Sequence, residues 1–404
     1  MFTKLKSLGR NVHLLAVSQA LMMSCMSLIL TASALVGYAL AEDKSFATFP
    51  IAVIFIAVMF TSIPAAMLMQ RIGRKRGFMF ATLFGMFGGG LATLAIMTTN
   101  FWLFCVSGIF IGIFNGFGNY FRFTAADSVA PEFKSRAISV VMVGGVVAAI
   151  VGPNLATLTR DSIDGIPFAG SYISIIVLYA LALLTLSFLK LTIPAVEAGQ
   201  DSSGQGRPLL EIARQPKFIV ALVCAMLGYG VMSFVMTATP LSMQHHTHTF
   251  PDTSFVIQWH VLGMFAPSFI TGTLIARFGI LKIIFIGAVL GLVCVATNLL
   301  GHSVLHYWIA LTLLGISWNF IFIGATSLLT ETYQQAERSK TQAANDFSVF
   351  TIVTIASLTA GTLQHNFGWQ VVNWGVVPLL IIILLSIVWL SIKQRTVTLE
   401  ATIS

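Results

Sequence analysis

The sequence predicts an all-α membrane protein with twelve transmembrane helices in two pseudo-symmetric six-helix halves, and two observations lead to this prediction. First, 57% of the 404 residues are hydrophobic and only 9% are charged, whereas about 25% of an average soluble domain is charged. Second, the segment Met26–Leu35 (MSLILTASAL) returns about half a chain later as Met232–Leu241 (MSFVMTATPL). Two similar membrane halves in one chain are typical of a secondary transporter, which binds its substrate between them.

Apolar runs of membrane-spanning length follow one another along the chain, because about 20 residues suffice to cross the hydrocarbon core. They must be helices, since the bilayer interior offers no water to the backbone N–H and C=O groups. The first run is too long for a signal peptide, lacks a small-residue cleavage site and begins the repeat. The expected spans are residues 13–40, 47–69, 78–98, 101–125, 138–159, 171–193, 218–243, 254–275, 280–300, 304–329, 343–363 and 370–392.

The chain is expected to divide into an N-terminal six-helix half (1–194), a cytoplasmic linker (195–217) and a C-terminal six-helix half (218–404). The centre of the linker, residues 199–206 (GQDSSGQG), is too polar to pack against a core. The other loops are short and leave no room for a soluble catalytic domain. The sequence therefore predicts that the protein is not an enzyme.

Basic residues predict the orientation of the chain. With the N-terminus inside, only Lys44 and Arg160 of the 22 Lys and Arg residues fall outside, so the positive-inside rule is nearly fully met. This pattern predicts that both termini are cytoplasmic. The net charge of +8 then follows from topology and anionic lipid, and it calls for no nucleic-acid partner.

The loop after the second expected span resembles a motif of the major facilitator superfamily, G-x-x-x-D-x-x-G-R-K/R. Gly73, Arg74 and Lys75 match its last three fixed positions, whereas Ala66 and Gln70 replace its first Gly and its Asp. Together with the layout of twelve spans in two halves, the resemblance covers essentially the whole chain. It implies the fold of that superfamily and transport by alternating access.

Other segments narrow this resemblance. Gly152-Pro153 in the fifth span is similar to the centre of an exporter motif, G-x-x-x-G-P-x-x-G-G. Tyr120–Asp127 (YFRFTAAD) and Trp318–Tyr333 (WNFIFIGATSLLTETY) resemble a bacterial subgroup of the superfamily. This implies a monomer in the bacterial inner (cytoplasmic) membrane. The subgroup supplies no substrate.

In this superfamily the first, fourth, seventh and tenth helices line the central cavity, so the resemblance implies that polar side chains on these helices contact the substrate. The candidates are Thr31, Asn115, Asn119, Arg122, Thr237, Trp318 and Asn319. Polar groups that face lipid are costly, which favours a cavity or a neighbouring helix as their surroundings. The alternative is structural, because hydroxyl groups bond to their own helix and Asn side chains join neighbouring helices.

Arg122 is the sharpest of these candidates, because an Arg inside a membrane helix is rare. As a fixed cation it would attract a carboxylate or phosphate of the substrate. The alternatives are that it reaches for cytoplasmic water or pairs with Asp127.

Proton coupling and gating have their own candidates: His260, Asp346, Asp127, Arg71 and Arg74. An unperturbed histidine titrates near neutrality, so His260 would carry a proton, unless a neighbour such as Gln258 simply satisfies it. In the superfamily the Asp missing at position 70 helps to close the cytoplasmic side. We expect Asp346 to replace it by pairing with Arg71 or Arg74.

His245, His246 and His248 lie in one loop of the C-terminal half. Histidine side chains bind Zn²⁺ or Cu²⁺, but histidines in a short solvated loop are not held in a fixed geometry around a metal ion. The four cysteines have no metal-like spacing and lie in predicted helices. We therefore expect no metal site and no cofactor.

These observations predict a secondary active transporter of a small organic solute, in the form of a proton-coupled exporter of drugs or metabolites. The alternatives are an uptake permease for a vitamin, siderophore or organic anion, and a non-transporting sensor with the same fold. The expected partners are the small-molecule substrate, the lipid bilayer and protons. Aromatic and Met-rich helix faces, which include Trp318, suit an aromatic solute but are also ordinary packing.

Overall fold

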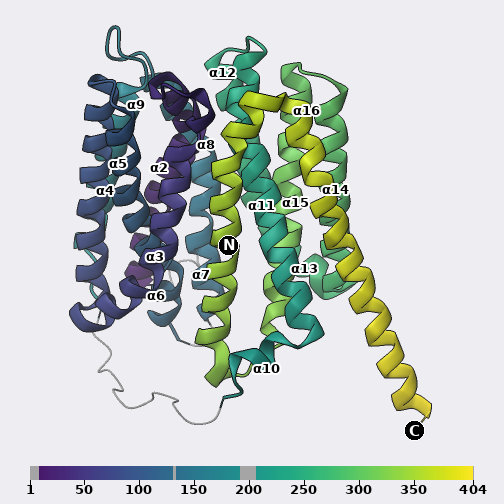
Figure 1. The fold of residues 1–404 in the computed structure, drawn as a ribbon. Coiled ribbons are helices and arrows are strands. Elements are labelled where there is room, and N and C mark those ends of the chain that lie inside the picture. Colours follow the sequence, from purple (N-terminus) through teal and green to yellow (C-terminus); the bar gives the residue numbers. More distant parts are fainter. Residues whose placement is uncertain (1–8, 131–132, 192–205, 404) are drawn as a thin grey trace.

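Helices make up most of the computed structural model, which describes residues 9–130, 133–191 and 206–403 (Figure 1). The first half contains α2 (Gly9–Leu40), α3 (Phe49–Ile72), α4 (Arg74–Met97), α5 (Phe101–Gly118), α6 (Phe121–Asp127), α7 (Lys134–Met142), α8 (Gly144–Thr159) and α9 (Ala169–Ser187). The second contains α10 (Leu209–Ala213), α11 (Pro216–His245), α12 (Phe250–Phe265), α13 (Ser268–Phe278), α14 (Ile280–Leu300), α15 (Val304–Thr330) and α16 (Arg338–Ile403).

The number of membrane spans follows from the lengths of these helices. In the described segments, ten helices are long and apolar enough to cross a membrane, and the pair α12 and α13, bent by 42°, adds an eleventh span. The span within α16 runs over 55 residues, which at 1.5 Å per residue is about 80 Å, whereas the bilayer core is about 30 Å thick. Gly368, with φ 77°, breaks this helix, so it provides two spans. The total of twelve agrees with the predicted all-α fold.

Glycines at corresponding places bring helices into close contact in each half. A Cβ atom on Gly112 of α5 would lie 2.5 Å from the Ile54 carbonyl oxygen of α3, and one on Gly315 of α15 would lie 2.3 Å from the His260 carbonyl oxygen of α12. Small residues of this kind allow helix backbones to approach within a membrane. The repeated glycines are therefore a property of the fold.

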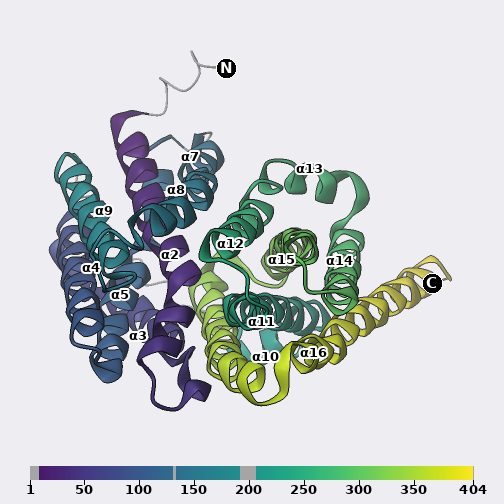
Figure 2. The same cartoon turned by 90° about the horizontal axis from the view of Figure 1, so that it is seen from above.

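The two halves lie side by side, and each contributes helices to a long interface (Figures 1 and 2). Across it, α8 packs on α12, α3 packs on α16, and α2 contacts α11. Within the second half, α15 lies among α11, α12 and α14 (Figure 2). Side chains of α2, α3, α8, α11, α12 and α16 are thereby placed at the interface.

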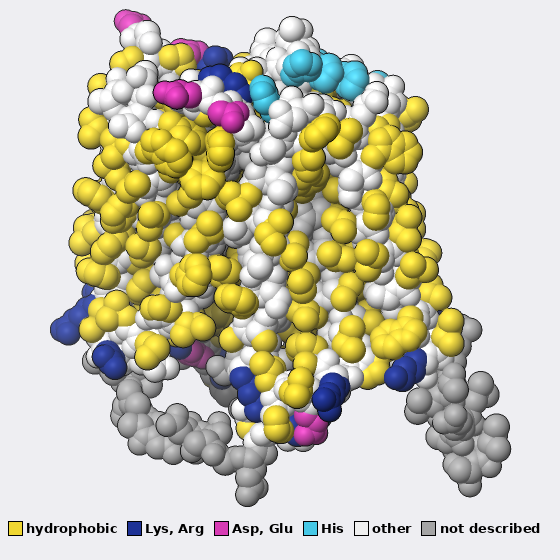
Figure 3. All heavy atoms as spheres, in the orientation of Figure 1, with side chains coloured by type: hydrophobic (Ala, Val, Ile, Leu, Met, Phe, Trp, Pro, Cys, Tyr) yellow, Lys and Arg dark blue, Asp and Glu magenta, His cyan; other side chains and the backbone are white. Residues whose placement is uncertain are grey.

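The molecule has two chemically different ends separated by an apolar band (Figure 3). One end, here called the basic end, includes Arg71, Arg74, Lys282 and Lys393. The opposite end carries the short 3-10 helix η2 (Lys44–Phe46) and is called the η2 end. Exposed apolar side chains between the two ends are those expected to contact lipid.

At the η2 end, hydrogen bonds join the halves through the loop before α3. Thr48 Oγ1 donates to the Ser357 carbonyl at 2.6 Å and accepts from the Gly361 amide at 3.1 Å. Thr362 Oγ1 donates to the Ser45 carbonyl at 3.1 Å. A Cβ atom on Gly361 would lie 2.7 Å from Thr48 Oγ1, so a larger residue would separate the halves here.

A second set of contacts joins α8 to α12. Ser254 Oγ donates to the Pro153 carbonyl at 2.6 Å, and Asn154 Nδ2 donates to Gln258 Oε1 at 2.7 Å. Nearby, the rings of Phe168 and Phe250 meet edge to face at 4.9 Å. Together with the contacts of Thr48 and Thr362, these interactions form what we call the η2 seal.

Part of the expected linker differs from the prediction. Residues 195–205 lie outside the described residues, but from residue 206 onward the chain packs on the C-terminal half. Arg207 forms an ion pair with Glu337 at 2.8 Å, and its amide donates to the same carboxylate at 2.7 Å. Composition cannot reveal this contact, because the two residues are far apart in sequence.

Candidate functional site

Five aromatic side chains of the C-terminal half form a cluster next to the interface. Trp318 and Phe322, one turn apart on α15, stack at 5.0 Å with their planes 10° apart. Tyr229 of α11 meets both edge-on, at 5.3 and 5.4 Å. Phe265 of α12 lies 6.2 Å from Trp318, and Phe350 of α16 lies 6.4 Å from Tyr229. We call these five residues the aromatic cluster.

Contacts with the N-terminal half place this cluster at the boundary between the halves. The Phe265 ring lies 2.6 Å from where a Cβ atom on Gly145 of α8 would be. Thr351, next to Phe350 in α16, lies 3.5 Å from the Met59 sulfur of α3. The cluster therefore lies at the boundary between the halves, which makes its side chains candidates for contact with a substrate.

Arg122 is the cation that reaches the cluster from the N-terminal half. Its side chain on α6 is half-buried, and its charge interacts with Asp346 of α16 and with Tyr229. Its buried Nε has no hydrogen-bond partner within the protein. A buried donor in this state is costly, so an acceptor on a bound molecule would relieve the cost.

Asp346 belongs to the opposite half, and its charge interacts with that of Arg122 without an ion pair between them. Its exposed carboxylate accepts from Asn345 Nδ2 at 3.1 Å and also interacts electrostatically with Tyr120. Opposite charges are thus held on the two halves, and approach of the halves would bring them together.

The expected partners of these charges differ in the structure. Asp127 pairs with Arg74 at 2.8 Å rather than with Arg122, and Arg74 also donates to Thr124 at 3.2 Å. Arg71 is exposed. In this conformation Arg74 pairs within the N-terminal half, because α6 places Asp127 beside it. The expected pairing of Asp346 with Arg71 or Arg74 is replaced by the electrostatic interaction of Asp346 with Arg122.

Unsatisfied polar atoms mark further positions near the aromatic cluster. Trp318 Nε1, Asn345 Oδ1 and Thr354 Oγ1 are buried without a hydrogen-bond partner, as is Thr237 Oγ1 farther along α11. They lie on α11, α15 and α16, and α11 packs against both of the other helices. Donors and acceptors are thus available around an otherwise apolar site, as is typical of small-molecule pockets.

The other expected substrate residues divide between a structural role and a position that could contact substrate. Thr31 Oγ1 donates to the Ser27 carbonyl of its own helix at 2.8 Å, which favours the structural reading. Asn119 is exposed. It follows Gly118, which packs on Met22 of α2, whereas Gly116 packs on α3. By helix geometry Asn119 lies between α2 and α3 and faces the interface.

The symmetric asparagines have mainly structural contacts. Asn319 is fully buried, and its Nδ2 donates to the Met264 carbonyl at 2.7 Å and to Ser268 Oγ at 2.6 Å. Its Oδ1 accepts from Thr271 at 2.6 Å. These bonds connect α15 to both sides of the bend between α12 and α13. Asn115 Nδ2 donates to the Ile111 carbonyl of its own helix at 2.9 Å.

Comparison with known proteins gives the family of this chain. A family model described as Major Facilitator Superfamily matches residues 15–238 and again 221–402. The chain belongs to the major facilitator superfamily. The two matches fall on the two membrane halves of this transporter, and they identify it as a multi-pass transport protein rather than an enzyme.

Three relatives resemble the transporter over most of its length. The riboflavin transporter RfnT of Brucella anthropi is 41% identical over 393 residues, which are 97% of this chain and 98% of the relative. The uncharacterized MFS-type transporter YdeG of Bacillus subtilis is 28% identical over 89% of this chain and 86% of its own. YddS of the same organism, also described as uncharacterized, is 27% identical over 79% and 77%.

His260 of this transporter is fully buried between α12 and α15. Its Nδ1 lies 2.8 Å from the Leu311 carbonyl, whereas Nε2 is buried without a partner. The neighbour expected to satisfy it, Gln258, instead binds Asn154 across the halves. The contact with Leu311 fits a histidine that joins two helices.

The loop histidines gather at the η2 end of the C-terminal half (Figure 3). His246 stacks on His302 at 4.0 Å, and its Nδ1 lies 2.8 Å from the Ser242 carbonyl. His248 contacts the His302 carbonyl. Among the described residues, no group of three His, Cys, Asp or Glu residues is arranged to hold a metal ion.

Sequence reasoning did not find Tyr229, Phe265 or Phe350. One signal was available for Tyr229, because it lies four residues before Ser233, one turn away on the same face of the repeated helix. Phe265 and Phe350 have no comparable signal among the many phenylalanines of this chain. Their role depends on how α12 and α16 pack.

Proposed function

We propose that this transporter takes up riboflavin, or a closely related flavin, by alternating access. The observation that carries this proposal is the aromatic cluster, with Arg122 and the unpartnered Trp318 Nε1 beside it. The similarity to a riboflavin transporter over nearly the whole of both chains supports the same conclusion. This makes uptake of a vitamin, rather than efflux, the proposed direction.

The chemistry of riboflavin fits these side chains. Its planar tricyclic ring offers a large apolar face, which aromatic side chains bind by stacking and edge contacts. One edge of the ring carries two carbonyl groups, which accept hydrogen bonds from donors such as Arg122 Nε and Trp318 Nε1. The ribityl hydroxyl groups match the polar atoms of Asn345, Thr354 and Thr237, which have no partner within the protein.

For orientation, we propose that the basic end is cytoplasmic, with both termini on that side of a bacterial inner membrane. The Lys and Arg residues at this end support this orientation through the positive-inside rule. The η2 seal then closes the outer side, and the charges of Arg122 and Asp346 lie toward the cytoplasmic side. We further propose a monomer.

For coupling, we propose that Asp346 is the group whose charge matters to transport, because it faces both the boundary and Arg122. Protonation of Asp346 would weaken its attraction to Arg122 and free the guanidinium for substrate. His260 is the alternative proton carrier, although its complete burial opposes the charged form.

A second candidate substrate is an anionic aromatic solute, such as an aromatic carboxylate. The guanidinium of Arg122 beside an aromatic cluster supports it, because Arg recognises carboxylates with paired hydrogen bonds. Riboflavin is uncharged at neutral pH, so competition by each compound separates the two candidates.

The experiment is flavin binding by the purified transporter, followed as quenching of flavin fluorescence, and uptake by proteoliposomes. Riboflavin should bind and enter, and Trp318→Ala should weaken binding by about tenfold, or about 1.4 kcal/mol. Trp374→Ala is the matched control, because Trp374 is 61% exposed on α16. Binding of an aromatic carboxylate without binding of riboflavin would reject the proposal, and binding without uptake would favour the sensor.

A further inference from the structure

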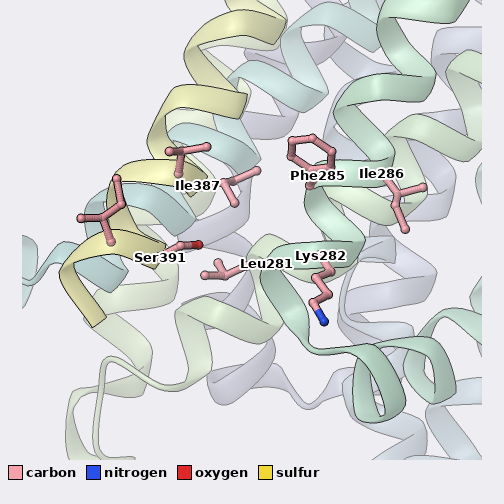
Figure 4. Close-up of a pocket in the computed structure, with 8 residues that line it drawn as sticks. Leu281, Lys282, Phe285, Ile286, Ile387 and Ser391 are labelled. Atoms are coloured by element: carbon pink, nitrogen blue, oxygen red, sulfur yellow. The ribbon is translucent and has the colours of Figure 1, made fainter. Parts of the chain in front are cut away.

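A groove opens between α14 and the last part of α16, on the outer side of the C-terminal half (Figure 4). These helices are in contact near Gly291, where a Cβ atom would lie 2.9 Å from the Leu380 side chain. Toward the basic end they enclose a cavity of about 500 Å³. Phe285 and Ile387 line it, and Ser391 and Lys282 lie at its lower edge (Figure 4).

The groove continues toward the basic end into a larger cavity of about 1330 Å³. The two cavities share Lys282 and Ser391, and the larger one is also lined by Lys217, Lys393 and Glu331. The groove therefore changes along its length from apolar to cationic. This change has the direction expected for the boundary between hydrocarbon and headgroups.

The charges of this groove are only partly neutralised. Lys217 pairs with Glu331 at 2.6 Å. Lys393 lies over the Trp389 ring at 5.5 Å, and Lys282 is exposed and forms no ion pair with the described residues. Three lysines against one glutamate leave a net positive charge beside an apolar cavity.

We propose that this groove binds an anionic phospholipid of the surrounding bilayer. An acyl chain would occupy the apolar cavity beside Phe285 and Ile387, and the phosphate would lie against Lys282, Lys393 and the Ser391 hydroxyl. Basic pockets between transmembrane helices on the cytoplasmic side are suited to anionic headgroups. Charge complementarity selects this occupant over a zwitterionic lipid, which would gain less from Lys282 and Lys393, neither of which forms an ion pair with a side chain that the structure describes.

The lipid site is separate from the proposed substrate site. It is lined by the C-terminal half alone, and it includes none of the aromatic cluster, Arg122 or Asp346. A lipid there would connect α14 to the end of α16, where the two helices diverge (Figure 1). The expected effect is a more stable C-terminal half, independent of the transported solute.

The test is thermal unfolding of the full-length, delipidated transporter in mixed micelles that contain phosphatidylglycerol or phosphatidylcholine. Phosphatidylglycerol should raise Tm by at least about 2 °C over phosphatidylcholine. The double variant Lys282→Gln/Lys393→Gln should lose this difference. The matched control Lys134→Gln/Lys190→Gln changes two exposed lysines of the other half and should keep it.

Several outcomes would overturn the lipid site. Equal Tm values of the unaltered transporter in both lipids would do so, as would a full phosphatidylglycerol effect in the Lys282/Lys393 variant. An equal effect of inorganic phosphate would indicate a simple anion site, and a lipid-dependent dimer in native mass spectrometry would assign the groove to a second copy. Because the comparison is between lipids, a variant that is less stable in both remains informative. Val388→Trp, at an exposed position of the cavity lining, fills the cavity without changing charge and should also reduce the effect.

Discussion

The charges of Arg122 on α6 and Asp346 on α16 interact electrostatically from opposite halves of the transporter without forming an ion pair. The halves are joined by hydrogen bonds at the η2 end, so rotation about that end changes the separation of these charges. Closure of the basic end would bring them together. The pair is thus placed to favour the closed form of that end.

Charge reversal tests this relationship. Arg122→Glu and Asp346→Arg should each reduce riboflavin uptake by proteoliposomes at least tenfold, and the double variant should recover part of it. Coupling between residues in contact is about 0.5–3 kcal/mol. Arg74→Glu combined with Asp346→Arg should give no recovery, because Arg74 pairs with Asp127. If only the variant with both Arg74→Glu and Asp346→Arg recovered uptake, that result would instead support the ion pair between Arg74 and Asp346 that is expected from the sequence.

The asparagines should differ in their effect on stability. Asn319→Ala removes bonds to Met264, Ser268 and Thr271 across three helices, and a buried partner left unsatisfied costs about 1–3 kcal/mol. Asn115→Ala removes a bond within its own helix and should cost less. Thermal unfolding without substrate measures this difference. A larger loss for Asn115→Ala would contradict the structural role of Asn319.

Acid should reveal the contact between Arg207 and Glu337. Hydrogen bonds from the Arg207 side chain, and then from the Gln334 amide, lower the pKa of Glu337 to about 2. A lowered carboxyl pKa gives stability that is present above the unfolded pKa, near 4.3, and is lost as pH falls toward 2. Glu337→Gln should therefore flatten the fall in Tm between pH 4.5 and 2. Glu331→Gln, which removes a half-exposed ion pair with Lys217, should change it little.

Mildly acidic pH should lower the stability of the folded protein through the histidine-containing loops at the η2 end. Desolvation, followed by the charges of His246, His306 and His248, lowers the pKa of His302. Its neutral form is thus favoured in the folded protein, and the stability this provides is lost as pH falls through the unfolded pKa near 6.5. His302→Gln should show a smaller fall in Tm between pH 7.5 and 5. The exposed His365→Gln is the control, and equal slopes for both variants would argue against the effect.

The sequence predicted the helices well and the contacts of the site only in part. Composition and the repeat predict twelve helical spans, because each apolar run is long enough for a helix to cross the bilayer and a helix satisfies its own backbone. The spacing of Trp318 and Phe322 already places them on one face. In contrast, the sequence cannot show that Asn319 holds the bend of α12 and α13, since an asparagine facing a cavity and one facing a helix look alike.

Long-range partners account for the other differences. The sequence predicts Asp346 beside Arg74, but α6 places Asp127 there, and Asp127 forms the ion pair with Arg74. Likewise, Arg207 was placed in a flexible linker because its partner, Glu337, lies far along the chain. Such pairs are fixed by the packing of helices, and no local pattern encodes them.

The η2 seal has a consequence for the energetics of a membrane under voltage. Its hydrogen bonds come from hydroxyl, amide and carbonyl groups of Thr48, Ser254 and their neighbours, none of which carries a formal charge. Moving one elementary charge across a potential of 100 mV is worth about 2.3 kcal/mol, but breaking these bonds moves none. The hydrogen bonds of the seal should therefore respond little to the electrical gradient. The charge that a voltage can move at this end is that of Arg160, whose guanidinium lies over the Phe168 and Phe250 rings at 5.2 and 5.3 Å.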